Sequence, residues 1–127
     1  MMQRNQHNKR AKGDIGENYS SLRLEKDGYS VICRNYVFRG GEIDIIASKG
    51  QYLCFVEVKT RSILSGENAA EAVNSAKLER LKKGVCEFLR EFSDDPHISA
   101  LTPRIDIMEI YTDNGTVKKY NHIIGIS

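Results

Sequence analysis

Residues 41–61 read GEIDIIASKGQYLCFVEVKTR and predict two paired strands. The segments 42–47 and 52–60 are rich in β-branched and aromatic residues, which favour strands. Only residues 48–51 separate the two segments, and this connection contains Gly50. Two strands joined so closely form an antiparallel hairpin.

The alternation of side chains indicates the surroundings of residues 52–60. Residues 53, 55, 57 and 59 share one face of the strand, and residues 54, 56 and 58 share the other. Both faces are apolar as far as Val56, so we expect the strand to be covered on both sides in the middle of a layered sheet. Glu57 and Lys59 are the polar exceptions at its end.

Acidic residues also stand at the beginning of the first strand. Glu42 and Asp44 share a face with Ile46 if this strand is regular. The beginning of one strand meets the end of the other in an antiparallel hairpin, so these two acids should converge with Glu57 and Lys59 at its open end. Asp44 and Glu57 must then lie on one face, because a one-residue slip of the register would separate them.

Three carboxylates and one ammonium at such short range need compensation by protons or by a cation. Mg²⁺ (or Mn²⁺) suits carboxylate oxygens and binds through one or two of them together with water and a substrate phosphate. Such a metal polarises a phosphodiester and activates water, while Lys59 orients that water or offsets developing negative charge. The implied reaction is phosphodiester hydrolysis. The alternative is a structural ion pair between Glu57 and Lys59.

The rest of the chain predicts elements that frame the hairpin. They are a helix over residues 14–26, a strand over 29–36, a long amphipathic helix over 67–92, and strands over 104–111 and 117–124. Asp14 is a good N-cap for the first helix, and Gly28 stops it. This order indicates an α/β fold with a mixed sheet.

The motifs at residues 41–47 and 55–61 resemble those of the YraN-like family of bacterial proteins, uncharacterised protein family 0102, itself similar to the restriction-endonuclease-like PD-(D/E)xK nuclease superfamily. The resemblance runs from Gly13 to the C-terminus and also takes in Gly16, Glu17, Arg34, Asn35, Lys77, Arg104 and Asp106. It implies an α-β-β-β-α-β core with a mixed central sheet flanked by helices, here with an extra C-terminal strand. It also implies that Asp44 and Glu57 are metal ligands, that Lys59 is the catalytic lysine and that Glu17 is an accessory catalytic acid.

Further residues are candidates for contact with the substrate, namely Glu42, Arg61 and Lys77. Plainer roles stay open. Glu42 can face water, Glu17 can face either solvent or the site, and Lys77 can lay its stem along the sheet. Arg80, Lys82 and Lys83 alternate with acids on the long helix, which favours a solvated face, and Arg104 and Asp106 can pair with each other.

Composition favours one domain. The chain has 127 residues, 40% of them hydrophobic and 28% charged, which is a globular balance. We expect a flexible basic arm over residues 1–12, which either touches nucleic acid or keeps the chain soluble, and a single nuclease-like domain over 13–127.

The cysteines and the apolar runs bear on the compartment. Cys33, Cys54 and Cys86 are too far apart for the close pairs of a zinc site and odd in number, so we expect buried thiols. No apolar run approaches the ~20 residues of a membrane span, and the first residues lack a secretory leader. We therefore expect a soluble, cytoplasmic protein that does not bind a membrane.

The function predicted from these observations is a Mg²⁺-dependent (or Mn²⁺-dependent) endonuclease that hydrolyses DNA, with branched or damaged DNA as its substrate. One alternative is a catalytically silent module on the same fold that binds nucleic acid or protein. Another is RNA cleavage by the same metal chemistry. The sequence leaves open whether the chain forms a homodimer.

Overall fold

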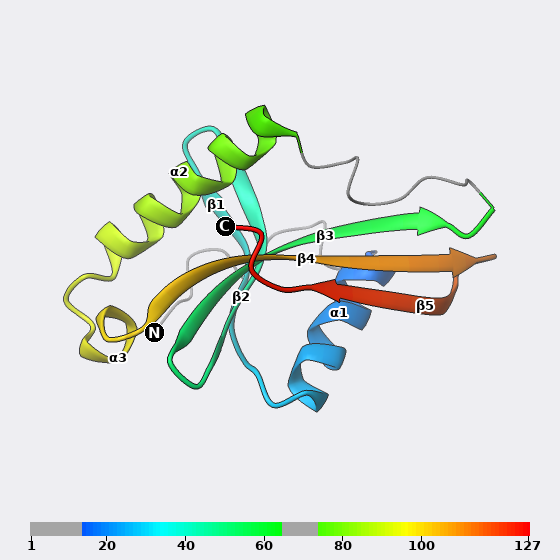
Figure 1. The fold of residues 1–127 in the computed structure, drawn as a ribbon, viewed down its shortest axis with the longest axis horizontal. Coiled ribbons are helices and arrows are strands. Elements are labelled where there is room, and N and C mark those ends of the chain that lie inside the picture. Colours follow the sequence, from blue (N-terminus) through cyan, green and yellow to red (C-terminus); the bar gives the residue numbers. More distant parts are fainter. Residues whose placement is uncertain (1–13, 65–73) are drawn as a thin grey trace.

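The computed structural model describes residues 14–64 and 74–127, which form a five-stranded sheet with helices on both faces (Figure 1). In chain order the elements are α1 (Ile15–Lys26), β1 (Ser30–Phe38), β2 (Gly41–Lys49), β3 (Tyr52–Ser62), α2 (Ser75–Glu91), α3 (Pro96–Ser99), β4 (Thr102–Asp113) and β5 (Thr116–Ile123). This confirms the predicted α-β-β-β-α-β order and the extra C-terminal strand. The four-residue helix α3, capped by Asp95, was not predicted.

The sheet has the strand order β1-β2-β3-β4-β5, so β3 lies at its centre as expected. Strands β1, β2 and β3 are antiparallel neighbours, β3 and β4 are parallel, and β4 and β5 are antiparallel. Parallel neighbours need a crossover connection, and α2 lies in that connection. The predicted mixed sheet is therefore confirmed.

Two hydrophobic cores cover the central strands. On one face Leu81, Val85 and Phe88 of α2 pack with Ile46 and Phe55. On the other face the core gathers Leu24 of α1 with Tyr29, Ile45, Ala47, Cys54, Val56, Met108 and Ile110. Alternate residues of β3 thus enter opposite cores, which is why that strand is apolar on both faces.

A glycine brings α1 very close to β3. A Cβ atom at Gly16 would overlap the hydroxyl oxygen of Thr60. Only a residue without a side chain fits there, so this contact sets the distance of the first helical turn from the C-terminal half of β3. The start of α1 therefore lies beside the strand that carries Glu57 and Lys59.

The boundaries of α2 correct one prediction. The helix begins at Ser75 and not at residue 67, because Asn74 is extended and its side chain accepts a hydrogen bond from Lys77 N at 2.9 Å. The capping amide ends the helix on its N-terminal side. The predicted residues 67–73 lie outside the described part of the chain.

The cysteines correct a second prediction. Cys33 and Cys54 are buried, as predicted, and burial raises the pKa of the Cys54 thiol to about 11. Cys86 was expected to be buried but is exposed on α2, since its neighbour Val85 occupies the buried side of that helix. The basic arm lies outside the described residues. No helix within residues 14–64 and 74–127 is long and apolar enough to cross a bilayer.

Candidate active site

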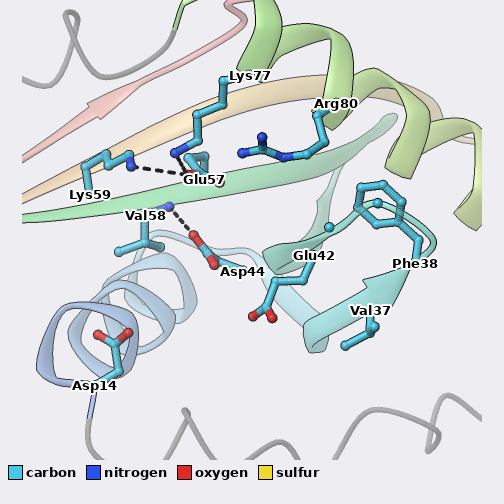
Figure 2. Close-up of a pocket in the computed structure, with 12 residues that line it drawn as sticks. Asp14, Val37, Phe38, Glu42, Asp44, Glu57, Val58, Lys59, Lys77 and Arg80 are labelled. Atoms are coloured by element: carbon cyan, nitrogen blue, oxygen red, sulfur yellow. Dashed lines mark hydrogen bonds and ion pairs between the residues drawn. The ribbon is translucent and has the colours of Figure 1, made fainter.

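A cleft of about 710 Å³ opens where β2 and β3 separate (Figure 2). It is lined by Asp14, Val37, Phe38, Gly40, Gly41, Glu42, Asp44, Glu57, Val58, Lys59, Lys77 and Arg80. The predicted convergence of Glu42, Asp44, Glu57 and Lys59 at the open end of the hairpin is confirmed. Carboxylates outnumber cationic side chains in this described lining, four to three.

The register of the β2–β3 hairpin brings Asp44 opposite Glu57, as the proposed site requires. Ile45 lies opposite Val56 and Ile46 lies opposite Phe55, which places Asp44 across from Glu57. Beyond Ile45 the strands no longer pair, and the Asp44 carboxylate accepts a hydrogen bond from Val58 N at 2.7 Å. The side chain of Asp44 thus bonds to β3 at the point where backbone pairing stops.

Glu57 binds two lysines from different elements. The Oε2 atom of Glu57 lies 2.6 Å from Lys77 Nζ, which comes from the first turn of α2, and 3.6 Å from Lys59 Nζ on its own strand (Figure 2). The Glu57 side chain is only 9% exposed, so both contacts are poorly screened. The alternative of a structural Glu57–Lys59 pair is therefore incomplete, because Lys77 holds the shorter contact.

The two lysines differ electrostatically. Burial lowers the pKa of Lys59, and the neighbouring Lys77 ammonium lowers it further. Burial also acts against the charged form of Lys77, but the hydrogen bond and charge of Glu57 and the contact with Lys59 together outweigh burial, so the pKa of Lys77 is raised. Lys77 is thus the main counterion of Glu57, and Lys59 is the ammonium that loses its proton more easily.

Behind the cleft, Asn35 joins two further acids. Its side-chain amide donates to Glu17 Oε2 at 2.9 Å and to Glu42 Oε2 at 3.3 Å, while Arg34 binds Glu17 Oε1 at 2.9 Å. Asn35 is 1% exposed and has a φ of 54°, the left-handed conformation that Asn tolerates better than most residues. Glu42 is therefore held by Asn35 of β1, which also binds Glu17 of α1.

The side chains of β2 do not alternate regularly as expected. Ile43 and Ile46 both enter the core under α2, although three residues separate them. Regular pleating would send them to opposite faces, so the alternation changes between them, next to Asn35 on β1. Glu42 consequently does not continue the face of Ile46, yet it still lines the cleft.

Some of the other predicted residues line the cleft and others lie outside its lining. Lys77 lines the cleft, and α2 directs its ammonium at Glu57. Glu17 is 1% exposed and lies in the Asn35 network behind the lining, so its open alternatives resolve to a buried position next to the site. Arg61 is not among the lining residues. Arg104 and Asp106 pair with each other, as anticipated.

Two charged residues of the cleft lining, Arg80 and Asp14, were not predicted as site residues. Arg80 was placed on a solvated face, but from α2 it extends over the cleft towards Glu57 (Figure 2). Its position three residues after Lys77 was the available signal, since residues at that spacing are neighbours on a helix. Asp14 was assigned only as a cap; it does accept from Glu17 N at 2.9 Å, and it also lines the cleft.

The donor chemistry of the cleft fits a hard divalent cation. Asp44 and Glu57 supply carboxylate oxygens from adjacent strands, and acids are in excess around them. Within residues 14–64 and 74–127, no three His, Cys, Asp or Glu side chains form a ready cage for a metal. Mg²⁺ needs no such cage, since it keeps several waters and takes one or two carboxylates.

The comparisons with known proteins agree with the motifs. The sequence model of the Uncharacterised protein family UPF0102 matches residues 16–110. The chain belongs to this family, the YraN-like one that its motifs resemble. A UPF0102 protein of Carboxydothermus hydrogenoformans is 39% identical over 103 residues, 81% of this chain and 84% of its own length. One of Chloroflexus aurantiacus is 35% identical over 91% of this chain and 92% of its own.

Among solved structures, an XisH family protein of Nostoc punctiforme is similar to this UPF0102 chain at 14% sequence identity. The match covers 84% of this chain and 98% of the other, with a TM-score of 0.36.

Proposed function

We propose that this UPF0102 protein is a metal-dependent endonuclease that hydrolyses phosphodiester bonds in DNA. The observation that carries the proposal is the meeting of Asp44, Glu57 and Lys59 in one cleft at the open end of the β2–β3 hairpin. A carboxylate pair with an adjacent ammonium supplies the two needs of phosphodiester hydrolysis, a place for a cation and a group for proton or charge transfer.

Asp44 and Glu57 would hold Mg²⁺ or Mn²⁺, which supplies Lewis-acid activation of the phosphate and of water when bound. Val58 N orients the Asp44 carboxylate by its 2.7 Å hydrogen bond. Lys59, whose pKa burial and Lys77 lower, is suited to hold or move a proton beside the scissile phosphate. Glu17 acts indirectly, because Asn35 links it to Glu42.

The cationic side chains of the cleft favour a polyanionic substrate. Lys77 and Arg80 project from α2 over the carboxylates, where phosphates on either side of the scissile bond can reach them. Residues 14–64 and 74–127 form no separate element for reading base sequence, so we favour branched or damaged DNA, recognised by its shape, as the substrate.

A cleavage assay tests the proposal. Wild-type protein is incubated with linear, nicked, flapped and four-way DNA and with matched RNA, each with Mg²⁺, Mn²⁺ or chelator. We expect metal-dependent cleavage of at least one DNA structure and none by Asp44→Asn. Cleavage only of RNA would change the substrate, and cleavage equal in Asp44→Asn would remove the proposed metal site.

A second candidate is a catalytically silent nucleic-acid-binding module. The observation that favours it is the state of Glu57, whose Oε2 atom already contacts two ammonium groups. On this hypothesis the ion-paired carboxylate only arranges Lys59 and Lys77 for phosphate contact. Binding of the same DNA without cleavage in any metal would support the module.

A further inference from the structure

One carboxylate oxygen at the centre of the cleft carries both ion pairs of Glu57. Lys77 Nζ and Lys59 Nζ contact the same atom, Oε2, at 2.6 Å and 3.6 Å. The Glu57 side chain is 9% exposed and that of Lys77 is 17% exposed, so the shorter pair lies largely out of bulk water. A charge-assisted hydrogen bond of this length is at the strong end of its class.

The two lysines reach Glu57 from different elements. Lys59 is two residues from Glu57 on the same strand, so its stem keeps the ammonium close to the carboxylate. Lys77 reaches the same oxygen from α2, on a stem of four methylenes. The backbone of Lys77 is fixed by its hydrogen bond to Asn74, so only side-chain rotation is needed to withdraw the ammonium.

We propose that Lys77 is an exchangeable counterion of Glu57 and that it competes with the divalent cation for this carboxylate. The inference rests on the proposed function, since it assigns Glu57 as a metal ligand. It adds that Lys77 sets the affinity of the site, because a cation enters only when the ammonium withdraws. The withdrawn ammonium stays in the cleft, where Arg80 already lies.

Calorimetric titration of Mn²⁺ into the full-length protein, without DNA, tests the competition. Lys77→Met keeps the length of the side chain and removes its charge. We expect it to bind Mn²⁺ on the order of tenfold more tightly than wild type, the effect of losing one strong competing contact. Lys77→Arg retains a cation at this place and should bind Mn²⁺ within about threefold of wild type.

Lys82→Met is the matched control for the change in net charge. Lys82 lies on the same helix, is 47% exposed and contacts only Glu79 at 3.9 Å among the ion pairs of the described residues. Its removal should leave the Mn²⁺ affinity unchanged. Equal tightening in Lys82→Met and Lys77→Met would mean a general charge effect and would overturn the proposal.

The remaining outcomes separate this inference from the proposed function. Unchanged or weaker Mn²⁺ binding by a folded Lys77→Met, with Asp44-dependent binding by wild type, overturns the exchange and leaves the nuclease proposal standing. No Mn²⁺ binding by wild type or by Lys77→Met overturns both.

A second measurement uses the wild-type side chain. Reductive methylation followed by mass spectrometry reports how readily each lysine reacts. We expect saturating Mg²⁺ to accelerate methylation of Lys77 relative to Lys82, and to have no such effect in Asp44→Asn. Slower methylation of Lys77 with Mg²⁺, or an unchanged rate, contradicts withdrawal of the ammonium.

Discussion

Asp106 and Glu57 are buried carboxylates on neighbouring strands, yet their surroundings differ in kind. Asp106 is fully buried and accepts hydrogen bonds from Arg104 Nε, from an Arg104 terminal nitrogen and from Gly125 N, each at 2.9 Å. His122 Nε2 lies 2.8 Å from the same carboxylate. Glu57 instead lines an open cleft, and lysines contact one of its oxygens.

The difference separates a carboxylate that holds the fold from one that is available for chemistry. Burial acts against the charge of Asp106, but the bonds from His122, Arg104 and Gly125 outweigh it and lower the pKa of Asp106. These donors tie the C-terminal residues to β4, where Ile126 N also bonds to Ile105 O at 2.8 Å. Removal of Asp106 should therefore destabilise the fold, whereas removal of a cleft carboxylate should stop the proposed cleavage.

The largest effect is expected from Asp106→Ala. The change leaves the Arg104 side chain, which is 16% exposed, without its fully buried carboxylate partner, and breaking a buried pair costs roughly 3 to 5 kcal/mol. Urea denaturation measures the loss in the free energy of unfolding. Glu79→Ala, an exposed position on α2, serves as the control and should change that free energy by less than about 0.5 kcal/mol. A loss in the free energy of unfolding below about 1 kcal/mol for Asp106→Ala would contradict the stabilising role that separates Asp106 from Glu57.

Lys59→Ala should have the next largest effect, on cleavage and not on folding. We expect the cleavage rate to fall by at least ~10²-fold, the usual result of removing one preorganised electrostatic group, with metal binding and most DNA affinity retained. Lys118→Ala, an exposed lysine of β5, is the matched control and should cleave normally. An inactive wild type together with lost DNA affinity in Lys59→Ala would favour the binding module.

The sequence predicted the central hairpin well because two independent signals agreed there. The apolar residues on both faces of β3 specified a covered strand, and the short connection at Gly50 specified the pairing, so the register that aligns Asp44 with Glu57 followed. The placement of Lys77 at the cleft was open, because the angle of a helix on a sheet depends on side-chain packing that a helical projection does not contain.

The features that the sequence did not predict also depend on tertiary packing. The change of alternation in β2 accompanies the left-handed conformation of Asn35 on the neighbouring strand, and nothing in residues 42–47 signals it. The exposure of Cys86 depends on which side of α2 meets the sheet. Asn74, a good N-cap, marks the start of α2, but the apolar period of the sequence continues before Asn74 and predicts a longer helix.

The pH dependence of stability gives a further test of the stabilising role of Asp106. The pKa of Asp106 is lower in the folded protein than in the unfolded chain, so its stabilisation is fully present above the unfolded pKa and is lost as pH falls through that value towards the folded one. We expect the wild-type free energy of unfolding to fall below about pH 5, with a contribution from Asp106 of up to about 1.4 kcal/mol per pH unit. Urea denaturation between pH 7 and pH 3 measures this slope. Asp106→Asn should show a shallower slope, and an equal slope would assign the acid sensitivity to other groups.

Only a small effect on stability is expected from Asp44→Asn, although the same change should abolish metal binding. The asparagine oxygen can still accept the hydrogen bond from Val58 N, and the lost charge relieves the excess of acid in the cleft. The free energy of unfolding in chelator should therefore stay within about 1 kcal/mol of wild type, or rise slightly. Urea denaturation with chelator and with Mn²⁺ measures both properties, since a metal that binds only the folded state stabilises it. Mn²⁺ should stabilise wild type and not Asp44→Asn. A loss of more than about 2 kcal/mol in chelator would place Asp44 beside Asp106 as a carboxylate that holds the fold, and equal stabilisation by Mn²⁺ would place the metal elsewhere.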